Sequence, residues 1–180
     1  KKMRKSGCWN IFFGYETGVE ELAKNILTNK KNRDFEKMKR ISRWTREAGI
    51  ETRAGFLVGL PGETPELAKK TIQTAIELDP DYAQFTVCCP YPGTKLANEI
   101  HEGKWGKFLT HNLKEYNMWS ITWLPFGYKN AEELKNMERY AFRKFYLRPS
   151  YVIRRILAIR SFEDIKRYIK GGTALVKGFL

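Results

Sequence analysis

The sequence predicts an α/β fold: three parallel strands with helices, followed by a helical C-terminal extension. Three short apolar runs, within residues 8–16, 55–64 and 85–94, each end at a turn rich in Gly or Pro. An amphipathic stretch follows each run, and strands that alternate with helices are typical of βαβ units and a parallel sheet. Such sheets bind ligands at the carboxyl ends of their strands, where these turns fall.

The first strand and the helices after it are predicted from the period of the apolar residues. Residues 8–14 alternate as a strand, residues 19–27 favour a short helix, and a polar, basic loop is expected at 28–33. A helix is expected over 35–48, since apolar residues recur at helical spacing and Gly49 supplies a stop. One face of the strand is expected to carry Trp9, Ile11 and Phe13, and the other Cys8, Asn10 and Phe12.

The second and third strands are predicted at residues 52–58 and 82–88. Between them, Thr64 is a good N-cap and Pro65 a good first helical residue, so a helix is expected up to Leu78. A shorter helix is expected over 94–102. The strand positions expected to face the helices are Trp9, Ile11, Phe13, Phe56, Val58, Phe85 and Val87.

The chain divides into three parts on its pattern. Residues 1–102 hold the strands and their helices, and residues 103–128 form an aromatic connecting segment with a short strand expected at 120–124. Residues 129–180 form a helical extension, with a clear amphipathic helix over 131–146. Pro149 and Ser150 indicate a turn and a new cap, after which two or three shorter helices are expected as far as Leu180.

Composition limits the class of protein. The chain of 180 residues is 42% apolar and 14% aromatic, which favours a packed core over disorder. No apolar run reaches the roughly 20 residues needed to span a membrane, and the basic start is not followed by a signal-peptide core. Three cysteines without a disulfide framework suit a reducing compartment, so we expect a cytoplasmic protein.

Positive charge is concentrated in the second part of the chain. The net charge is +13, of which residues 101–180 contribute +9, mostly between Arg139 and Lys170. Basic surfaces of this kind can bind nucleic acid, anionic lipid or an acidic partner. We favour a solvated helical face, or a face that docks on another part of the protein. No RNA-binding motif supports a nucleic-acid-binding module.

The ordered turn motifs resemble the second half of a radical S-adenosylmethionine (SAM) core. They are Phe-Gly-Tyr-Glu-Thr-Gly at 13–18, Ala-Gly-Ile at 48–50, Gly-Phe-Leu-Val-Gly-Leu-Pro-Gly-Glu-Thr at 55–64, and Pro-Tyr-Pro-Gly-Thr at 90–94. The series is most similar to the branch that includes the oxygen-independent magnesium-protoporphyrin monomethyl ester cyclases, and that often carries a cobalamin-binding domain. The resemblance implies that residues 1–102 form the C-terminal half of a partial (β/α) barrel.

The resemblance also implies cofactors. Family members hold a four-iron four-sulfur cluster on Cys-x-x-x-Cys-x-x-Cys, and use it to cleave SAM to a radical that abstracts hydrogen from a small-molecule substrate. The reaction implied is porphyrin-type oxidative cyclisation or methyl transfer, with cobalamin as a further cofactor of the branch. Here Cys8, Cys88 and Cys89 lack that spacing.

We therefore expect an excised C-terminal piece, inactive and without bound cofactors on its own. Its expected partner is the N-terminal half of its parent chain, and alone it is expected to self-associate through open strand edges. A small α/β domain unrelated to SAM is the remaining alternative.

Two sites are predicted for SAM from the resemblance. Glu16, after the first strand, is implied to bind the ribose diol, because a carboxylate accepts two hydrogen bonds. The family often has Glu-Ser-Gly-Ser there, and Val19 replaces the last hydroxyl. The alternative for Glu16 is a surface residue at a helix N-terminus. Gly55, Leu57 and Gly59 are implied to form a flat shelf for adenine, because alternate strand residues share a face; the alternative is a βα turn without a ligand.

The loop of Cys89, Pro90 and Tyr91 is implied to lie beside the adenine, since its prolines stiffen it. Tyr91 is alternatively a loop anchor. Glu63 is assigned to the turn or to capping. Arg53 is expected on the barrel side with an anionic partner, either a ligand or an acid such as Glu16. No catalytic residue or metal ligand is assigned, and the spacing of His101 and His111 does not suggest metal binding.

Overall fold

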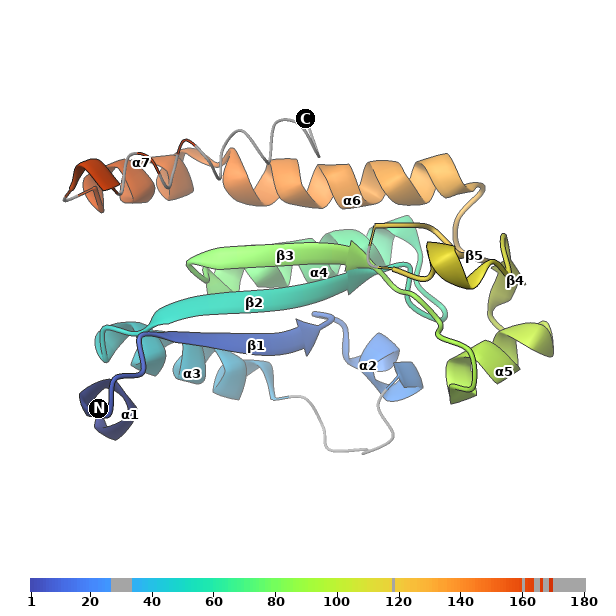
Figure 1. Ribbon diagram of the computed structural model, residues 1–180, viewed down its shortest axis with the longest axis horizontal. Coiled ribbons are helices and arrows are strands. Elements are labelled where there is room, and N and C mark those ends of the chain that lie inside the picture. The colour runs from blue at the N-terminus through green and yellow to red at the C-terminus, as the bar shows by residue number, and fades with distance from the viewer. Residues whose placement is uncertain (27–33, 118, 160, 164–165, 167–168, 170–180) are drawn as a thin grey trace.

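Three parallel strands form the centre of the molecule. The computed structural model describes residues 1–26, 34–117, 119–159, 161–163, 166 and 169. β1 (Asn10–Glu16), β2 (Glu51–Val58) and β3 (Tyr82–Val87) form a sheet in the order β1-β2-β3 (Figure 1). The predicted α/β fold is confirmed. The loop expected at 28–33 and the helices expected beyond residue 169 lie outside the described residues.

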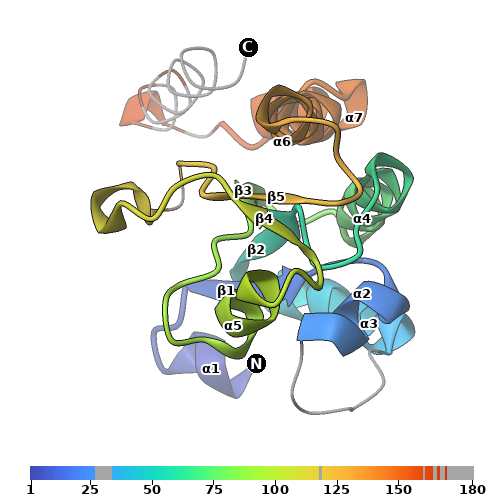
Figure 2. The same cartoon turned by 90° about the vertical axis from the view of Figure 1, so that its right-hand side faces the viewer.

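The long helices cover one face of this sheet. α3 (Phe35–Glu47) joins β1 to β2, and α4 (Pro65–Leu78) joins β2 to β3, while α6 (Ala131–Tyr146) packs along β3 and α4 (Figures 1 and 2). The predicted cap of α4 is confirmed, since the Thr64 side chain accepts a hydrogen bond from the Leu67 amide. The sheet face opposite these helices is open in the described part of the chain.

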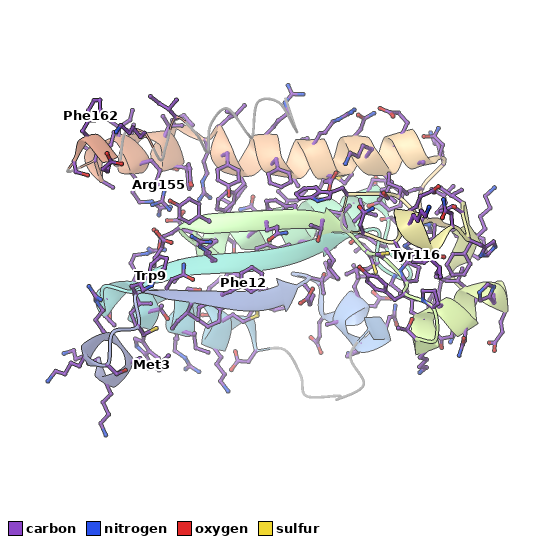
Figure 3. The ribbon with its side chains drawn as sticks, in the orientation of Figure 1. Met3, Trp9, Phe12, Tyr116, Arg155 and Phe162 are labelled. Atoms are coloured by element: carbon purple, nitrogen blue, oxygen red, sulfur yellow. The ribbon has the colours of Figure 1, made fainter. Side chains whose placement is uncertain are left out.

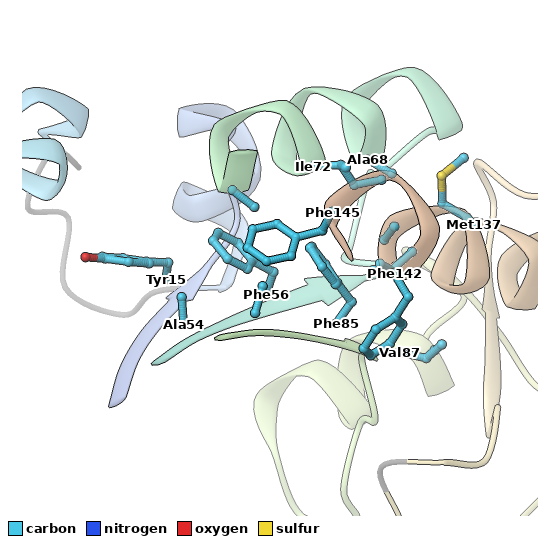
Figure 4. Packing of buried hydrophobic residues seen from close by; sticks show 14 of the residues in the cluster. Tyr15, Ala54, Phe56, Ala68, Ile72, Phe85, Val87, Met137, Phe142 and Phe145 are labelled. Carbon is cyan, nitrogen blue, oxygen red and sulfur yellow. The ribbon is translucent and has the colours of Figure 1, made fainter. Parts of the chain in front are cut away.

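Aromatic rings fill the space between the sheet and α6. Phe85 is fully buried, and its ring centroid lies 5.5 Å from those of Phe56 and Phe142 (Figure 4). The four positions predicted to face the helices on β2 and β3 are all buried, as expected. Trp9 is the exception among the predicted inward residues, because β1 begins one residue after it and its side chain is 62% exposed (Figure 3).

The connecting segment contains more structure than the sequence predicts. β4 (Gly106–Phe108) and β5 (Trp123–Pro125) form an antiparallel ribbon, so β4 was missed and the strand expected at 120–124 lies later. The indole N–H of buried Trp123 donates to the Cys88 carbonyl over 2.8 Å, which holds the ribbon at the end of β3. Three short helices complete this end and the N-terminus: α1 (Lys2–Lys5), α2 (Glu20–Ile26) and α5 (Lys95–His101), with η1 (Leu113–Glu115) in the segment.

The basic residues of α7 (Pro149–Leu157) face the protein interior. Arg148, its N-cap, and Arg154 pair with Asp79, while Arg155 lies 3.1 Å from the Asp81 carboxylate. Asp79 is the C-cap of α4 and takes a left-handed conformation (φ 47°). A solvated basic face is therefore wrong for α7, and Ser150 lies inside the helix rather than at its cap. No helix among the described residues is long and apolar enough to cross a membrane.

Candidate functional site

The carboxyl ends of β1, β2 and β3 meet at one end of the molecule. α2, α5, β4 and β5 gather around this end, and Figure 2 looks onto it (Figures 1 and 2). Glu16 ends β1, the turn of residues 59–63 follows β2, and the loop of residues 88–91 follows β3. The topology therefore brings together the three turns whose motifs carry the resemblance.

Glu16 takes an unusual backbone conformation at the end of β1. Its φ of 59° lies in the left-handed region, and the register between β1 and β2 is irregular between Gly14 and Glu16. The carboxylate folds back over Gly14, with Oε1 2.7 Å from the point that a Cβ at Gly14 would occupy. Because Gly14 shares parity with Phe12 and not with core-facing Tyr15, the carboxylate lies on the open face of the sheet.

Phe12 occupies the neighbouring position on the open face. Its ring Cζ lies 2.8 Å from the point that a Cβ at Gly55 would occupy, so the ring rests on that glycine. Gly14 and Gly55 are register partners, which places the Glu16 carboxylate and the Phe12 ring side by side (Figure 3 labels Phe12). The Phe12 side chain remains 56% exposed. The predicted flat shelf at Gly55 is therefore covered by an aromatic ring.

Gly59 does not share a face with Gly55 and Leu57, so this part of the predicted shelf is wrong. The strand ends at Val58, and Gly59 turns the chain with a φ of 75°. A Cβ there would lie 2.9 Å from Leu134 on α6, on the helical side. Leu57, in contrast, is partly buried beside the apolar cluster at the strand ends. Successive side chains point to opposite faces of the sheet only while the backbone is extended, which here is as far as Val58.

We expect Gly59→Val to damage folding itself, because it adds left-handed strain and a clash with α6. The expected loss in the free energy of unfolding is about 2–5 kcal/mol, the sum of about 1–2 for the backbone and 1–3 for overpacking. Gly103→Val is the matched control, since Gly103 has a φ of 77° but nothing lies within 4 Å of an added Cβ. Urea denaturation measures both, and equal losses would show that the Leu134 contact is unimportant.

The polar side chains of the open face pair with one another at the amino end of the strands. Glu51 Oε1 lies 3.4 Å from the Arg53 guanidinium and accepts from Asn10 Nδ2 over 3.0 Å. Arg53 is exposed rather than buried, and its guanidinium also lies over the Tyr82 ring. The anionic partner expected for Arg53 is therefore a structural acid, and the structure identifies it as Glu51.

The loop after β3 places its two cysteines in different surroundings. Cys88 is buried beside Trp123, and this burial raises the pKa of its thiol to about 12. Cys89 is partly exposed, with its sulfur 3.6 Å from the Thr122 hydroxyl. Pro90 is buried, whereas Tyr91 is half exposed with its ring centroid 6.3 Å from that of Tyr116. Cys89 and Tyr91 thus lie at the accessible rim of the strand ends.

Glu63 is a buried carboxyl group, which its place in a polar turn does not predict. Its Oε1 accepts hydrogen bonds from the Gly59 amide and, over 2.7 Å, from the Tyr128 hydroxyl. Its Oε2 is buried without a hydrogen-bond partner among the described residues, and burial raises the pKa to about 7. The assignment to the turn is correct in that Glu63 binds Gly59. The bond to Tyr128 has no sequence signal, because Tyr128 lies 65 residues away.

Comparisons with known proteins agree with the resemblance seen in the motifs. The chain is 32% identical over 179 residues to an uncharacterised methyltransferase of Pyrococcus horikoshii, covering 95% of this chain and 36% of that protein. It is 30% identical over 148 residues to an anaerobic magnesium-protoporphyrin IX monomethyl ester cyclase of Cereibacter sphaeroides, covering 82% of this chain and 23% of the cyclase. No protein-family model matches the chain.

Solved structures identify the superfamily. The radical SAM methyltransferase TsrM of Kitasatospora setae, solved with cobalamin and a four-iron four-sulfur cluster bound, matches with a TM-score of 0.51 and 28% identity, over 56% of this chain and 20% of TsrM. The chain is a distant homologue of radical SAM enzymes. Archaeal Elp3 of Methanocaldococcus infernus shares the fold, with a TM-score of 0.56 and 19% identity over 78% of this chain and 28% of that chain.

This radical SAM homologue spans about a third of its methyltransferase relative and about a quarter of the cyclase. Among its described residues, no group of three His, Cys, Asp or Glu side chains is arranged to hold a metal ion. Cys8, Cys88 and Cys89 are free, and the first lies before β1 while the other two follow β3. His101 and His111 stack on each other with centroids 5.6 Å apart. The described residues do not fit a four-iron cluster.

Proposed function

We propose that this chain supplies the second half of a SAM-binding barrel, and that the cluster cysteines lie on another part of the whole protein. The observation that carries the proposal is the Glu16 carboxylate, held by a left-handed backbone over Gly14 at the carboxyl end of β1. Ligands of parallel α/β sheets bind at this end. The homology to radical SAM enzymes supports SAM as that ligand.

The residues on the open face fit the nucleoside part of SAM. A ribose diol offers two donors, and an ionised carboxylate offers two acceptor oxygens. Beside it, the exposed Phe12 ring offers an apolar face on which a purine can stack. We propose Glu16 for the ribose, Phe12 and Leu57 for the adenine, and the loop of Cys89, Pro90 and Tyr91 as the rim. When bound with a cluster, SAM supplies hydrogen abstraction; the residues here bind and orient the nucleoside.

The cluster and the rest of the barrel require further strands. Within the described part of the chain, β1 pairs only with β2, so its outer edge presents unpaired backbone groups. We propose that a strand from an N-terminal half of the same protein pairs with this edge. The same edge explains why this chain alone is expected to dimerise or aggregate.

For the whole protein we propose methyl transfer to a small-molecule substrate, with cobalamin as a second cofactor. The methyltransferase relative aligns over 95% of the chain, and TsrM was solved with cobalamin. Oxidative ring closure on a porphyrin is the second candidate, because the cyclase relative aligns over 82% of the chain.

Glu16→Ala tests the ribose contact. The substitution is expected to weaken SAM binding by about 1.5–3 kcal/mol, the range for hydrogen bonds to a charged group, or roughly 10- to 100-fold. Calorimetry would use the whole protein, reconstituted anaerobically. Glu20→Ala is the control, since Glu20 is an exposed carboxylate in α2 paired with Lys24. Equal SAM affinities for the two variants would remove Glu16 from the site, and no SAM binding by the unsubstituted protein would refute the proposed function.

A further inference from the structure

α7 has the opposite orientation to an ordinary surface helix, because its charged side faces the protein and its apolar side faces solvent. A surface helix usually packs its apolar stripe on the core and exposes its charges. Here Arg154 and Arg155 point toward the sheet and pair with Asp79 and Asp81, and buried Tyr151 donates to the Asp81 carbonyl over 2.9 Å. Figure 3 shows Arg155 between α7 and the strands, with Phe162 on the outer side. The exposed apolar side chains are Val152, Ile153, Ile156, Leu157, Ile159 and Phe162.

This outward apolar face, Val152 to Phe162, is not needed to hold α7 in place. The arginines hold α7 against α4, β3 and α6. Arg148 and Arg155 are largely buried, and the Arg148 guanidinium also lies 4.3 Å from the Phe145 ring centroid. Leu157 is 77% exposed, so removing its side chain leaves no cavity. A contiguous exposed apolar face on a charged helix marks an interaction site.

The charge around the outward apolar face is mostly positive. Residues 139–162 contain seven Lys or Arg and no Asp or Glu, and the exposed acid Glu163, next to Phe162, pairs with Lys166. Among the described residues, Asp79 and Asp81 are the acids that pair with α7 and its N-cap. Four guanidiniums (those of Arg46, Arg148, Arg154 and Arg155) share these two carboxylates, so a positive excess remains there. Arg143 and Lys144, near the end of α6, are exposed beside α7. Aliphatic side chains flanked by cations are the pattern of helices that lie in a bilayer interface.

We propose that α7, together with Ile159 and Phe162 after it, binds the surface of an anionic lipid bilayer. The aliphatic side chains enter the boundary between headgroups and acyl chains, while the flanking cations meet lipid phosphates. A second copy of the chain would bring two faces of the same positive charge together. A nucleic acid would use the cations but leave Ile153, Ile156 and Leu157 in water. Charge complementarity therefore favours the lipid surface.

Vesicle sedimentation with the full-length protein tests this proposal. The probes are vesicles of phosphatidylcholine alone and vesicles that also contain 30% phosphatidylglycerol. At about one anionic lipid in three, several negative headgroups lie under each bound protein. We expect at least tenfold tighter binding to the anionic vesicles. The variant Ile153→Ser/Ile156→Ser/Leu157→Ser should lose at least tenfold in this binding. Arg143→Ser/Lys144→Ser should weaken binding to the anionic vesicles only.

The matched control is Leu113→Ser/Phe126→Ser, which removes equally exposed apolar side chains away from α7 and should bind vesicles like the unsubstituted protein. Circular dichroism checks that each variant is folded. Absence of binding to anionic vesicles at low salt would overturn the proposal, as would full binding by the triple variant. A triple variant that changes the oligomeric state in light scattering, with vesicle binding unaltered, would assign the face to a second copy. RNA binding that the triple variant retains, without vesicle binding, would assign the cations to nucleic acid.

Discussion

Phe85→Ala is expected to lower the free energy of unfolding by about 3–5 kcal/mol, the usual range for deleting a buried aromatic ring. Phe85 lies at the centre of the core, where its ring contacts Phe56 on β2 and both Phe142 and Phe145 on α6 (Figure 4). The substitution leaves a cavity between the sheet and α6, and α6 has few ways to close it because its ends are held by the β5 ribbon and by α7. Urea denaturation followed by circular dichroism measures the loss.

Phe126→Ala is the control for this experiment. Phe126 is the same residue type but is 70% exposed after β5, so its removal should change stability by less than about 0.5 kcal/mol. A loss below about 1 kcal/mol for Phe85→Ala would mean that β3 does not lie under α6 as described.

Glu63→Gln is expected to stabilise the protein above pH 7 and to remove a pH dependence. Burial raises the pKa of Glu63 to about 7 from 4.5, so the folded state favours the neutral carboxyl group. A raised pKa contributes stability that is fully present below about pH 4.5 and is lost as the pH rises to 7 and above. At 1.36 kcal/mol for each unit of pKa, the loss is about 3 kcal/mol. Gln is neutral at every pH and keeps an acceptor for the Gly59 amide and the Tyr128 hydroxyl.

The measurement is the free energy of unfolding of both proteins between pH 4.5 and 8. The difference between Glu63→Gln and the unsubstituted protein should grow in favour of the variant across this window, while Glu102→Gln, an exposed carboxylate, should follow the unsubstituted protein. Parallel curves for Glu63→Gln and the unsubstituted protein would show that Glu63 is ionised in the folded state at low cost.

The elements with strong local signals were predictable. The cap at Thr64, Pro65 in the first turn and the stop at Asp79 all act within a few residues, and the structure places α4 between them. Alternation on β2 and β3 likewise identified the buried positions, because every second residue of a paired strand faces the helices. Local signals were weaker at the start of β1. Trp9 has strand-like neighbours in the sequence, but β1 begins only at Asn10 and the Trp9 side chain is exposed. β4 was missed because three residues are too few to show a period.

The candidate site was predictable in part. The motifs located the three turns at the strand ends, and the parallel order of the sheet brings them together. The adenine shelf was wrong in detail, since it assumed that alternation continues to Gly59 and that nothing covers Gly55. The chain leaves the strand after Val58, and Phe12 comes across from the neighbouring strand. Neither fact is encoded in the spacing of Gly55, Leu57 and Gly59.

By itself the sequence determined the α/β class, the order of strands and helices, and the homology to radical SAM enzymes, because these depend on periodicity, capping and short ordered motifs. Only the tertiary structure decided which charges are buried. Glu63 meets Tyr128, and the arginines of α7 meet Asp79 and Asp81, across 65 or more residues of sequence. Such pairs form because folding brings a donor and an acceptor out of water together, and an unpaired charge there would be costly. The resulting inversion of α7, with its aliphatic side outward, follows from those pairs.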